Sequence, residues 1–258
     1  MSATADDITA AGLHLDIADA VATVTLDRPE VRNAQTPQMW LALAAIGEQL
    51  PGTVRVVVVR GAGAAFSAGL DRAMLDPAKG EVAGLLQLDD EAISKAIDGY
   101  QRGFTWLSDP QIVSVAAVHG YAIGAGFQLA LACDLRVVAD DVKFCMKEPA
   151  LGLVPDLTGT KPLVHLVGYS RALEICATAR YVESDEARHL GLATVVVPRA
   201  ELDATSTDLV EAVLANSAGA VRETKALLFE AGGRDLEEQR LAERQAQVRR
   251  FRELVGGG

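Results

Sequence analysis

The chain has 258 residues, of which 50% are hydrophobic and 23% charged, so it is long enough to bury a full core as a soluble globular protein. With 24 Lys and Arg against 35 Asp and Glu, its net charge of -11 argues against nucleic acid as the main partner. Three separated cysteines, Cys133, Cys145 and Cys176, predict neither a disulfide framework nor a zinc site. The N-terminus lacks a signal-peptide pattern and no apolar run reaches the roughly 18 residues of a membrane span, so we expect a cytoplasmic protein.

Apolar spacing predicts the elements of the first part of the chain. Alternation over residues 13–17 and 20–26 predicts a β-hairpin. Thr36 and Pro37 supply an N-cap and a first-turn proline for a helix whose apolar residues recur at helical spacing. The run 55–60 is apolar on both faces, which is typical of a strand buried within a sheet.

The middle of the chain predicts a second round of the same pattern. Residues 72–90 mix Asp, Pro, Gly and Lys with weak periodicity, and we expect a mobile surface segment there. A helix over about 91–107 follows. The next segments are predicted, in order, as strand, glycine loop, helix and buried strand: 112–118, 119–126, 127–132 and 135–139.

The last part of the chain changes character. We expect Ser170 and Ser184 to cap two further helices and residues 195–197 to form the last strand. Three helical stretches then follow, over about 201–216, 218–231 and 235–254. We therefore divide the chain into a core, 1–200, and a helical assembly region, 201–258, which is too small to hold a core alone and should pack on the core or on another subunit.

Familiar nucleotide and hydrolase motifs do not match. Gly159-Thr160-Lys161 lacks the Gly-Lys-Ser/Thr of a phosphate-binding loop, and no G-x-G-x-x-G lies between a strand and a helix. Residues 65–69 (AFSAG) have Ala where a nucleophile elbow has its first Gly, and the four histidines are scattered. The sequence therefore predicts neither a nucleotide site nor a serine hydrolase.

Two glycine loops, 67–71 and 120–126, share one design. In each, a buried strand runs into a Gly/Ala turn that lets the backbone approach a ligand closely. Two amides aimed at one point would make an oxyanion hole, which stabilises charge developing on a carbonyl or thioester oxygen. Two ordinary tight turns explain the same spacing equally well.

Four blocks in order carry a family resemblance: 28–34 (RPEVRNA), 66–71 (FSAGLD), 119–130 (HGYAIGAGFQLA) and 132–134 (ACD). In sequence and spacing they resemble the crotonase (enoyl-CoA hydratase/isomerase) superfamily, over essentially the whole chain. The resemblance implies an α/β fold, a crotonase-like spiral of β-β-α repeats with a C-terminal helical trimerisation region. It also implies an acyl-CoA substrate and a homotrimer or a hexamer built as a dimer of trimers. Because metal-ligand clusters are absent from the sequence, we expect no metal, nucleotide or redox cofactor.

The resemblance implies roles for four positions. Ala68 and Ala125 would donate the two backbone N–H groups to the thioester oxygen. A typical hydratase has one Glu three residues after its second oxyanion-hole residue and another twenty residues later; here these positions hold Gln128 and Glu148. Gln cannot exchange a proton near neutral pH, which puts hydration by two carboxylates in doubt.

A further acid, Asp156, stands where hydratases usually have Gly. Family members that move double bonds in dienoyl-CoA chains carry an acid there, as does the dehalogenase branch, but the position of the dehalogenase's ring-packing Trp holds Glu148. Members that shift a single double bond need only the Glu148-type carboxylate. The resemblance therefore favours proton shuttling by Glu148 with Asp156. A purely local hydrogen-bonding role explains an Asp after Pro155 equally well. The alternative function is a non-catalytic acyl-CoA binder.

Basic and small residues near the first loop are candidates for CoA binding. Arg28 and Arg32 could offset part of the phosphate charge, or serve only as solvated surface residues. Asp134 is expected to tie the next turn rather than to react. The remaining CoA-binding candidates lie in the first glycine loop: Ser67, Ala68, Leu70 and Asp71.

Overall fold

The computed structural model describes residues 4–76 and 80–256, which form two β-sheets surrounded by helices. The larger sheet has the order β1-β2-β3-β4-β6-β9, and the smaller has the order β5-β7-β8. Strands β1 and β2 pair antiparallel, and every other pair in the larger sheet is parallel. The strands are β1 (Leu13–Ala18), β2 (Val21–Leu26), β3 (Val56–Gly61), β4 (Val113–Val118), β5 (Tyr121–Ile123), β6 (Leu135–Ala139), β7 (Lys143–Cys145), β8 (Val182–Glu183) and β9 (Val195–Val197).

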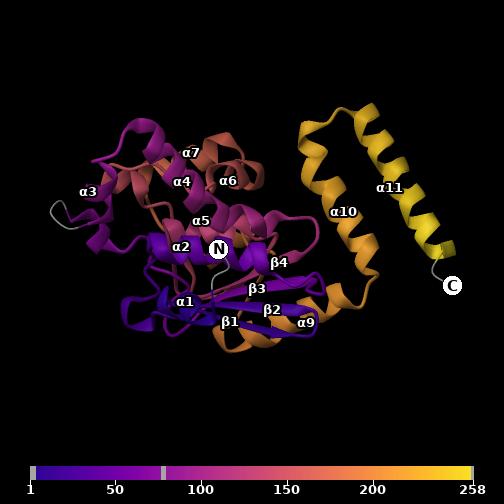
Figure 1. Ribbon diagram of the computed structural model, residues 1–258, viewed down its shortest axis with the longest axis horizontal. Coiled ribbons are helices and arrows are strands. Elements are labelled where there is room, and N and C mark those ends of the chain that lie inside the picture. The colour runs from indigo at the N-terminus through magenta and orange to yellow at the C-terminus, as the bar shows by residue number, and fades with distance from the viewer. Residues whose placement is uncertain (1–3, 77–79, 257–258) are drawn as a thin grey trace.

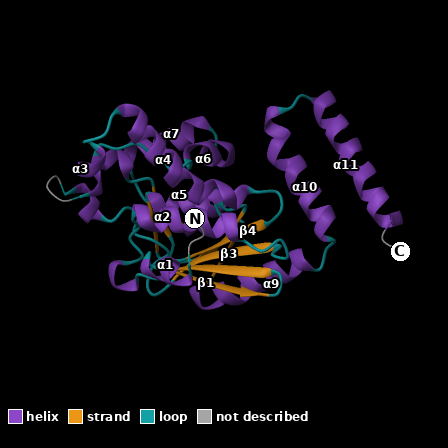
Figure 2. Ribbon diagram, in the orientation of Figure 1, coloured by secondary structure: helices purple, strands orange, loops and turns teal. Residues whose placement is uncertain are grey.

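The helices follow the strands in a repeating order, so the predicted α/β spiral of β-β-α units is confirmed. Strands β1 and β2 lead into α2, β4 and β5 into α5, and β6 and β7 into α6. Figure 2 shows the strands of the larger sheet, in orange, with helices on either side of them. The helices are α1 (Ala5–Ala10), α2 (Pro37–Gln49), α3 (Glu81–Leu85), α4 (Asp90–Thr105), α5 (Ala125–Ala132), α6 (Thr160–Val167), α7 (Tyr169–Thr178), α8 (Ser184–His189), α9 (Leu202–Leu214), α10 (Ala218–Glu230) and α11 (Leu236–Gly256).

The larger sheet is covered on both faces, as the apolar run in β3 predicts (Figure 1). Val56 and its neighbours on one face pack against Leu202 and Val210 of α9. Val57 and Val59, on the other face, belong to the main core, which includes residues of α2, α4 and α5. Because successive side chains of a strand point to opposite faces, apolar residues at every position bury both.

Local signals place the first helix accurately. The Thr36 hydroxyl accepts a hydrogen bond from the N–H of Met39 at 3.3 Å, and Pro37 occupies the first turn. The cap and the proline therefore do what the sequence predicts.

The structure adds detail to one expectation and corrects two others. The segment 72–90 contains a short 3-10 helix at Arg72–Leu75 and then α3, while residues 77–79 of that segment lie outside the described residues. Ser170 lies inside α7, whose N-cap is Gly168. Ser184 is the first residue of α8 and makes no capping hydrogen bond from that position, because β8 runs directly into the helix.

The C-terminal region is helical as predicted, but it divides into two parts (Figure 1). Helix α9 packs on the larger sheet, whereas α10 and α11 form a hairpin that stands away from the body. Lys225 fastens α10 by donating to the Ile112 carbonyl at 2.8 Å and pairing with Asp134 at 2.7 Å. Asp134 also accepts from the Ser114 N–H at 2.8 Å. Its hydrogen bonds are structural, as expected, but they join β4 to α10 rather than tie the next turn. Over the described parts of the chain, we find no helix with the length and apolar character needed to cross a membrane.

Candidate active site

The two glycine loops run side by side. The Phe66 N–H donates to the His119 carbonyl at 2.8 Å, and the Ser67 N–H donates to the Tyr121 carbonyl at 2.9 Å. The Ile123 N–H donates to the Ser67 carbonyl at 3.0 Å. Gly69 has a φ of +82°, and a Cβ there would lie 2.3 Å from the Ile123 oxygen, so only glycine permits this close approach.

The structure changes the assignment of one of the two predicted oxyanion donors. The Ala68 N–H donates to the Arg32 carbonyl at 2.8 Å, so this amide is already used and the prediction for Ala68 needs correction. In contrast, the N–H groups of Leu70 and Ala125 have no hydrogen-bond partner among residues 4–76 and 80–256. A Cβ at Gly69 would lie 3.5 Å from the Ala125 nitrogen, which places Leu70 next to the second loop. Leu70 and Ala125 are therefore the amides available to a thioester oxygen.

Glu148 and Gln128 form a buried pair. The Gln128 Nε2 donates to Glu148 Oε1 at 2.7 Å. The Gln128 Oε1 accepts from the N–H groups of Leu157 at 2.9 Å and Gly159 at 3.2 Å, which determines the orientation of the amide. Glu148 is only 9% exposed, and in the described part of the chain its Oε2 has no partner. A Cβ at Gly124 would lie 3.1 Å from Glu148 Oε1, so the carboxylate lies beside the second loop.

The surroundings make Glu148 a stronger base than an exposed carboxylate. Burial raises the pKa of Glu148, and the negative charge of Asp156 raises it further, while the hydrogen bond from Gln128 opposes the change. Asp156 is exposed at the surface, yet partial desolvation raises the pKa of its carboxyl as well. The Asp156 carbonyl accepts from Gln101 at 2.7 Å, which anchors the backbone of that turn.

This raised pKa predicts a pH-dependent gain of stability on replacing Glu148 by Gln. The folded protein binds the Glu148 proton more tightly than the unfolded chain, so the wild type loses stability as pH rises through the raised pKa. The Gln variant escapes this loss, and its melting temperature should exceed that of the wild type at pH 8, by roughly 2–4 °C for each kcal/mol of stability gained. The difference should shrink as pH falls toward the usual carboxyl range. Scanning calorimetry at several pH values measures it, and a pH-independent difference would contradict the assignment.

The residues proposed for CoA binding gather around the first loop. Arg28 donates to Asp71 at 3.1 Å and to the Ala34 carbonyl at 2.7 Å, so its charge is partly compensated. The Arg32 guanidinium lies 5.7 Å from the centre of the Tyr121 ring. Arg32 therefore remains the better candidate for a phosphate contact.

Ser67 lies inside this loop rather than on its surface. The side chain is fully buried, and its hydroxyl donates to the Asn33 carbonyl at 2.8 Å. The hydroxyl also accepts from Gln35 at 3.0 Å and from the Gly69 N–H at 3.1 Å. These bonds fill its capacity, so the Ser67 hydroxyl supports the loop and does not bind CoA.

Sequence reasoning missed two buried amides that hold the first loop. Asn33 donates to the carbonyls of Ala62 and Ala65, each at 2.8 Å, and has a φ of +55°. The Gln35 amide donates a hydrogen bond to the Ser67 hydroxyl and accepts one from the Trp40 indole N–H at 2.8 Å. A polar residue just before a helix is a weak signal of such a role, because the sequence does not show which carbonyl groups its side chain will contact.

The chain matches a known family in both sequence and fold. The sequence profile of the family described as enoyl-CoA hydratase/isomerase matches residues 16–254. A Thermobifida fusca YX protein crystallised with CoA is 50% identical, with a TM-score of 0.93 over 99% of both chains. Its complex with acetoacetyl-CoA has 51% identity and a TM-score of 0.94, over 98% of this chain and all of that one.

Named relatives include both reaction types. The peroxisomal Delta(3,5)-Delta(2,4)-dienoyl-CoA isomerase of Arabidopsis thaliana is 33% identical, over 79% of this chain and 75% of its own. The short-chain-enoyl-CoA hydratase of Clostridium acetobutylicum is 31% identical, over 80% of this chain and 76% of its own. With a family profile that matches nearly the whole chain and a fold shared at 50% identity, the chain belongs to the enoyl-CoA hydratase/isomerase family.

Proposed function

We propose that the protein shifts the double bond of an enoyl-CoA thioester, with Glu148 as the proton carrier. The observation that carries this proposal is the single buried carboxylate beside the second loop, whose Oε2 has no partner in the described structure. Gln128, at the position of the first hydratase Glu, donates to the other oxygen and cannot exchange a proton. One carboxylate suffices to move a proton between two carbons on the same face of a substrate.

The proposed reaction is balanced without an added reagent. Glu148 Oε2 removes a proton from C2 of a 3-enoyl thioester, and the C–H electrons form a C1–C2 double bond while the thioester oxygen takes the negative charge. The N–H groups of Leu70 and Ala125 stabilise that oxygen. The protonated Glu148 then gives its proton to C4, where the electrons of the C3–C4 double bond form the new C–H bond. The C1–C2 electrons move to form the C2–C3 double bond, the negative charge on oxygen returns as the thioester C=O bond, and the carboxylate is regenerated. The step is redox-neutral and uses only protein groups, so the proposal includes no metal or cofactor.

Asp156 favours a second candidate, the isomerisation of dienoyl-CoA. Asp156 precedes Leu157, whose N–H donates to Gln128, and the charge of Asp156 raises the pKa of Glu148. A second carboxylate therefore lies near the Glu148–Gln128 pair. This reaction would use Glu148 at one end of the diene and Asp156 at the other. The same pair would add nothing to a single-bond shift.

Binding and turnover separate these reactions from a non-catalytic acyl-CoA binder. Calorimetry should show acetoacetyl-CoA binding more tightly than free CoA, because only the thioester can accept from the Leu70 and Ala125 amides. A panel of 3-enoyl-, 2-enoyl- and dienoyl-CoA esters should show isomerisation faster than hydration. Equal affinity for both ligands would remove the oxyanion-hole argument, and binding without any turnover would support the carrier instead.

We further propose that α10 and α11 form the assembly face of a trimer or of a dimer of trimers. Large apolar side chains of the hairpin are exposed. They are Leu228, Phe229, Leu236, Leu241, Val248, Phe251 and Leu254. Light scattering should give a mass of three or six chains of 27.2 kDa each. A stable monomer at micromolar concentration would contradict this proposal.

A further inference from the structure

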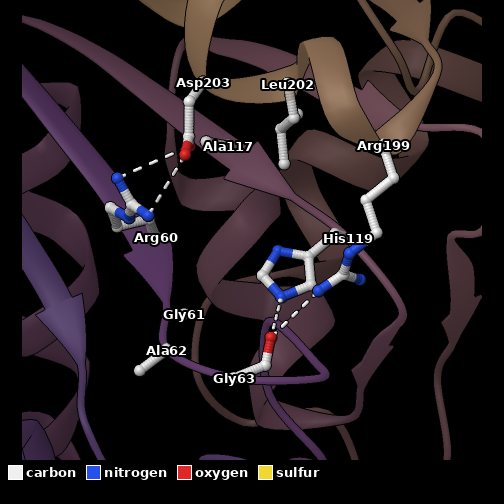
Figure 3. Close-up of a pocket in the computed structure, with 9 residues that line it drawn as sticks. All are labelled: Arg60, Gly61, Ala62, Gly63, Ala117, His119, Arg199, Leu202 and Asp203. Carbon is white, nitrogen blue, oxygen red and sulfur yellow. Dashed lines mark hydrogen bonds and ion pairs between the residues drawn. The ribbon is translucent and has the colours of Figure 1, made fainter.

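A cavity of about 150 Å³ lies where β3 and β4 end, against the start of α9 (Figure 3). It is polar, but both of its arginines have acidic partners. Arg60 pairs with Asp203 at 3.4 Å, and Arg199 pairs with Asp141 at 2.9 Å. The wall of the cavity also contains a contact between His119 and Gly63, which lie on the two segments that lead into the glycine loops.

His119 and Gly63 bridge the points where the two loops begin. Gly63 lies in the segment that leads from β3 into the first loop, and His119 lies between β4 and the second loop. The His119 Nε2 lies 3.1 Å from the Gly63 carbonyl oxygen (Figure 3). His119 is buried, with 7% of its surface exposed. A carbonyl oxygen can only accept, so Nε2 carries the hydrogen and donates it.

A second bridge joins the same two points. Arg199 also donates to the Gly63 oxygen, at 2.9 Å, and its other arm pairs with Asp141. Asp141 in turn accepts from the N–H of Gly120, the residue after His119, at 3.0 Å. The side chains of His119, Arg199 and Asp141 therefore hold Gly63 and Gly120 at a fixed separation.

We propose that His119 is a positioning residue for the oxyanion hole: its bond to Gly63 fixes the two loops against each other and so sets the placement of the Leu70 and Ala125 amides. The inference rests on the proposed function. Between the His119–Gly63 contact and those amides, the two segments are joined by backbone hydrogen bonds from Phe66, Ser67 and Ile123. A displacement at the start of one segment is therefore transmitted along both to the Leu70 and Ala125 amides.

The charge environment supports a neutral imidazole in this role. Burial lowers the pKa of His119, and the nearby cations Arg199 and Arg60 lower it further, while Asp141 opposes them. Asp203 faces the same cavity from α9 and is neutralised by Arg60. A neutral ring has one N–H, and the structure uses it on Gly63.

The test compares His119→Leu, which has no donor, with His119→Gln, whose amide can restore a donor to Gly63. The first readout is the near-ultraviolet absorbance of the enolate that forms when bound acetoacetyl-CoA loses its C2 proton. His119→Leu should bind free CoA like the wild type but lose most of the enolate signal. Its kcat for 3-enoyl-CoA should fall about 10–100-fold, the effect of misplacing groups by about 1 Å. His119→Gln should recover both quantities to within a few-fold of the wild type.

Arg60→Gln is the matched control, because Arg60 lines the same cavity and, within residues 4–76 and 80–256, its guanidinium pairs with Asp203 and not with Gly63. It should leave the enolate signal and kcat unchanged. An equal loss in Arg60→Gln, or a wild-type signal and rate in His119→Leu, would overturn the positioning role while leaving the proposed function intact. A wild type that forms no enolate would instead overturn the oxyanion hole, and this inference with it. If His119→Leu does not fold, Arg199→Leu carries the same test, since it removes the second donor to Gly63 and the link to Asp141.

Discussion

Replacing Glu148 by Gln should lower kcat for the double-bond shift by roughly 10²-fold to 10⁴-fold, the range for loss of a general base. The Gln side chain can still accept from Gln128 but cannot take a proton from C2. Binding of acyl-CoA should change little, because Leu70 and Ala125 donate through their backbone. Steady-state kinetics with a 3-enoyl-CoA, together with calorimetry, measure the two effects separately.

Asp156→Asn is the companion variant. It should cost less than Glu148→Gln if Asp156 only raises the pKa of its partner, and it should lower the pH at which the rate reaches half its maximum. A loss as large as that of Glu148→Gln, seen with dienoyl-CoA, would identify Asp156 as the second proton carrier. A fully active Glu148→Gln enzyme would show that the assignment of the base is wrong.

Gly69→Ala should lower kcat by about 10²–10³-fold, the effect of losing one oxyanion donor. The added Cβ would lie 2.3 Å from the Ile123 oxygen, so the two loops must separate, and the Leu70 and Ala125 amides separate with them. The positive φ of +82° adds roughly 1–2 kcal/mol of backbone strain. Kinetics and the melting temperature of the same variant distinguish the two effects.

Gly168→Ala is the control for strain alone. Gly168 has a similar φ of +77°, but a Cβ there would meet nothing within 4 Å. It should lose stability and retain kcat. If both variants lose stability equally and keep their activity, the close approach of the loops has no catalytic role.

The sequence predicts the fold wherever a pattern is long enough to repeat. The hairpin over β1 and β2, the helix from Pro37 and the three C-terminal helices follow from apolar periodicity and capping residues. Strands β5, β7 and β8 have only two or three residues each, so no alternation can reveal them. These short strands nevertheless position the second loop, since β5 lies within it.

The site is predicted at the level of positions but not of atoms. The family resemblance brings Gln128, Glu148 and both loops to one place, and the structure agrees. The resemblance does not show that the Ala68 N–H donates to the Arg32 carbonyl. Which amide of a tight turn stays free depends on hydrogen bonds to a segment more than thirty residues away in the chain, and local sequence does not contain that information.

Gln128 best separates the two reactions that the family performs. Its Oε1 accepts two backbone N–H groups, so its Nε2 must face Glu148. A Glu at this position would place a second carboxylate against the first, where the two must share a proton, and would restore the acid–base pair that hydration needs.

Turnover of a 3-enoyl-CoA in heavy-oxygen water tests the proton-shuttle account most directly, with products followed by mass spectrometry. The wild type should first form unlabelled 2-enoyl-CoA and incorporate oxygen from water only slowly, whereas Gln128→Glu should gain label faster relative to isomerisation. Rapid labelling of a 3-hydroxyacyl product by the wild type, with little double-bond shift, would contradict it.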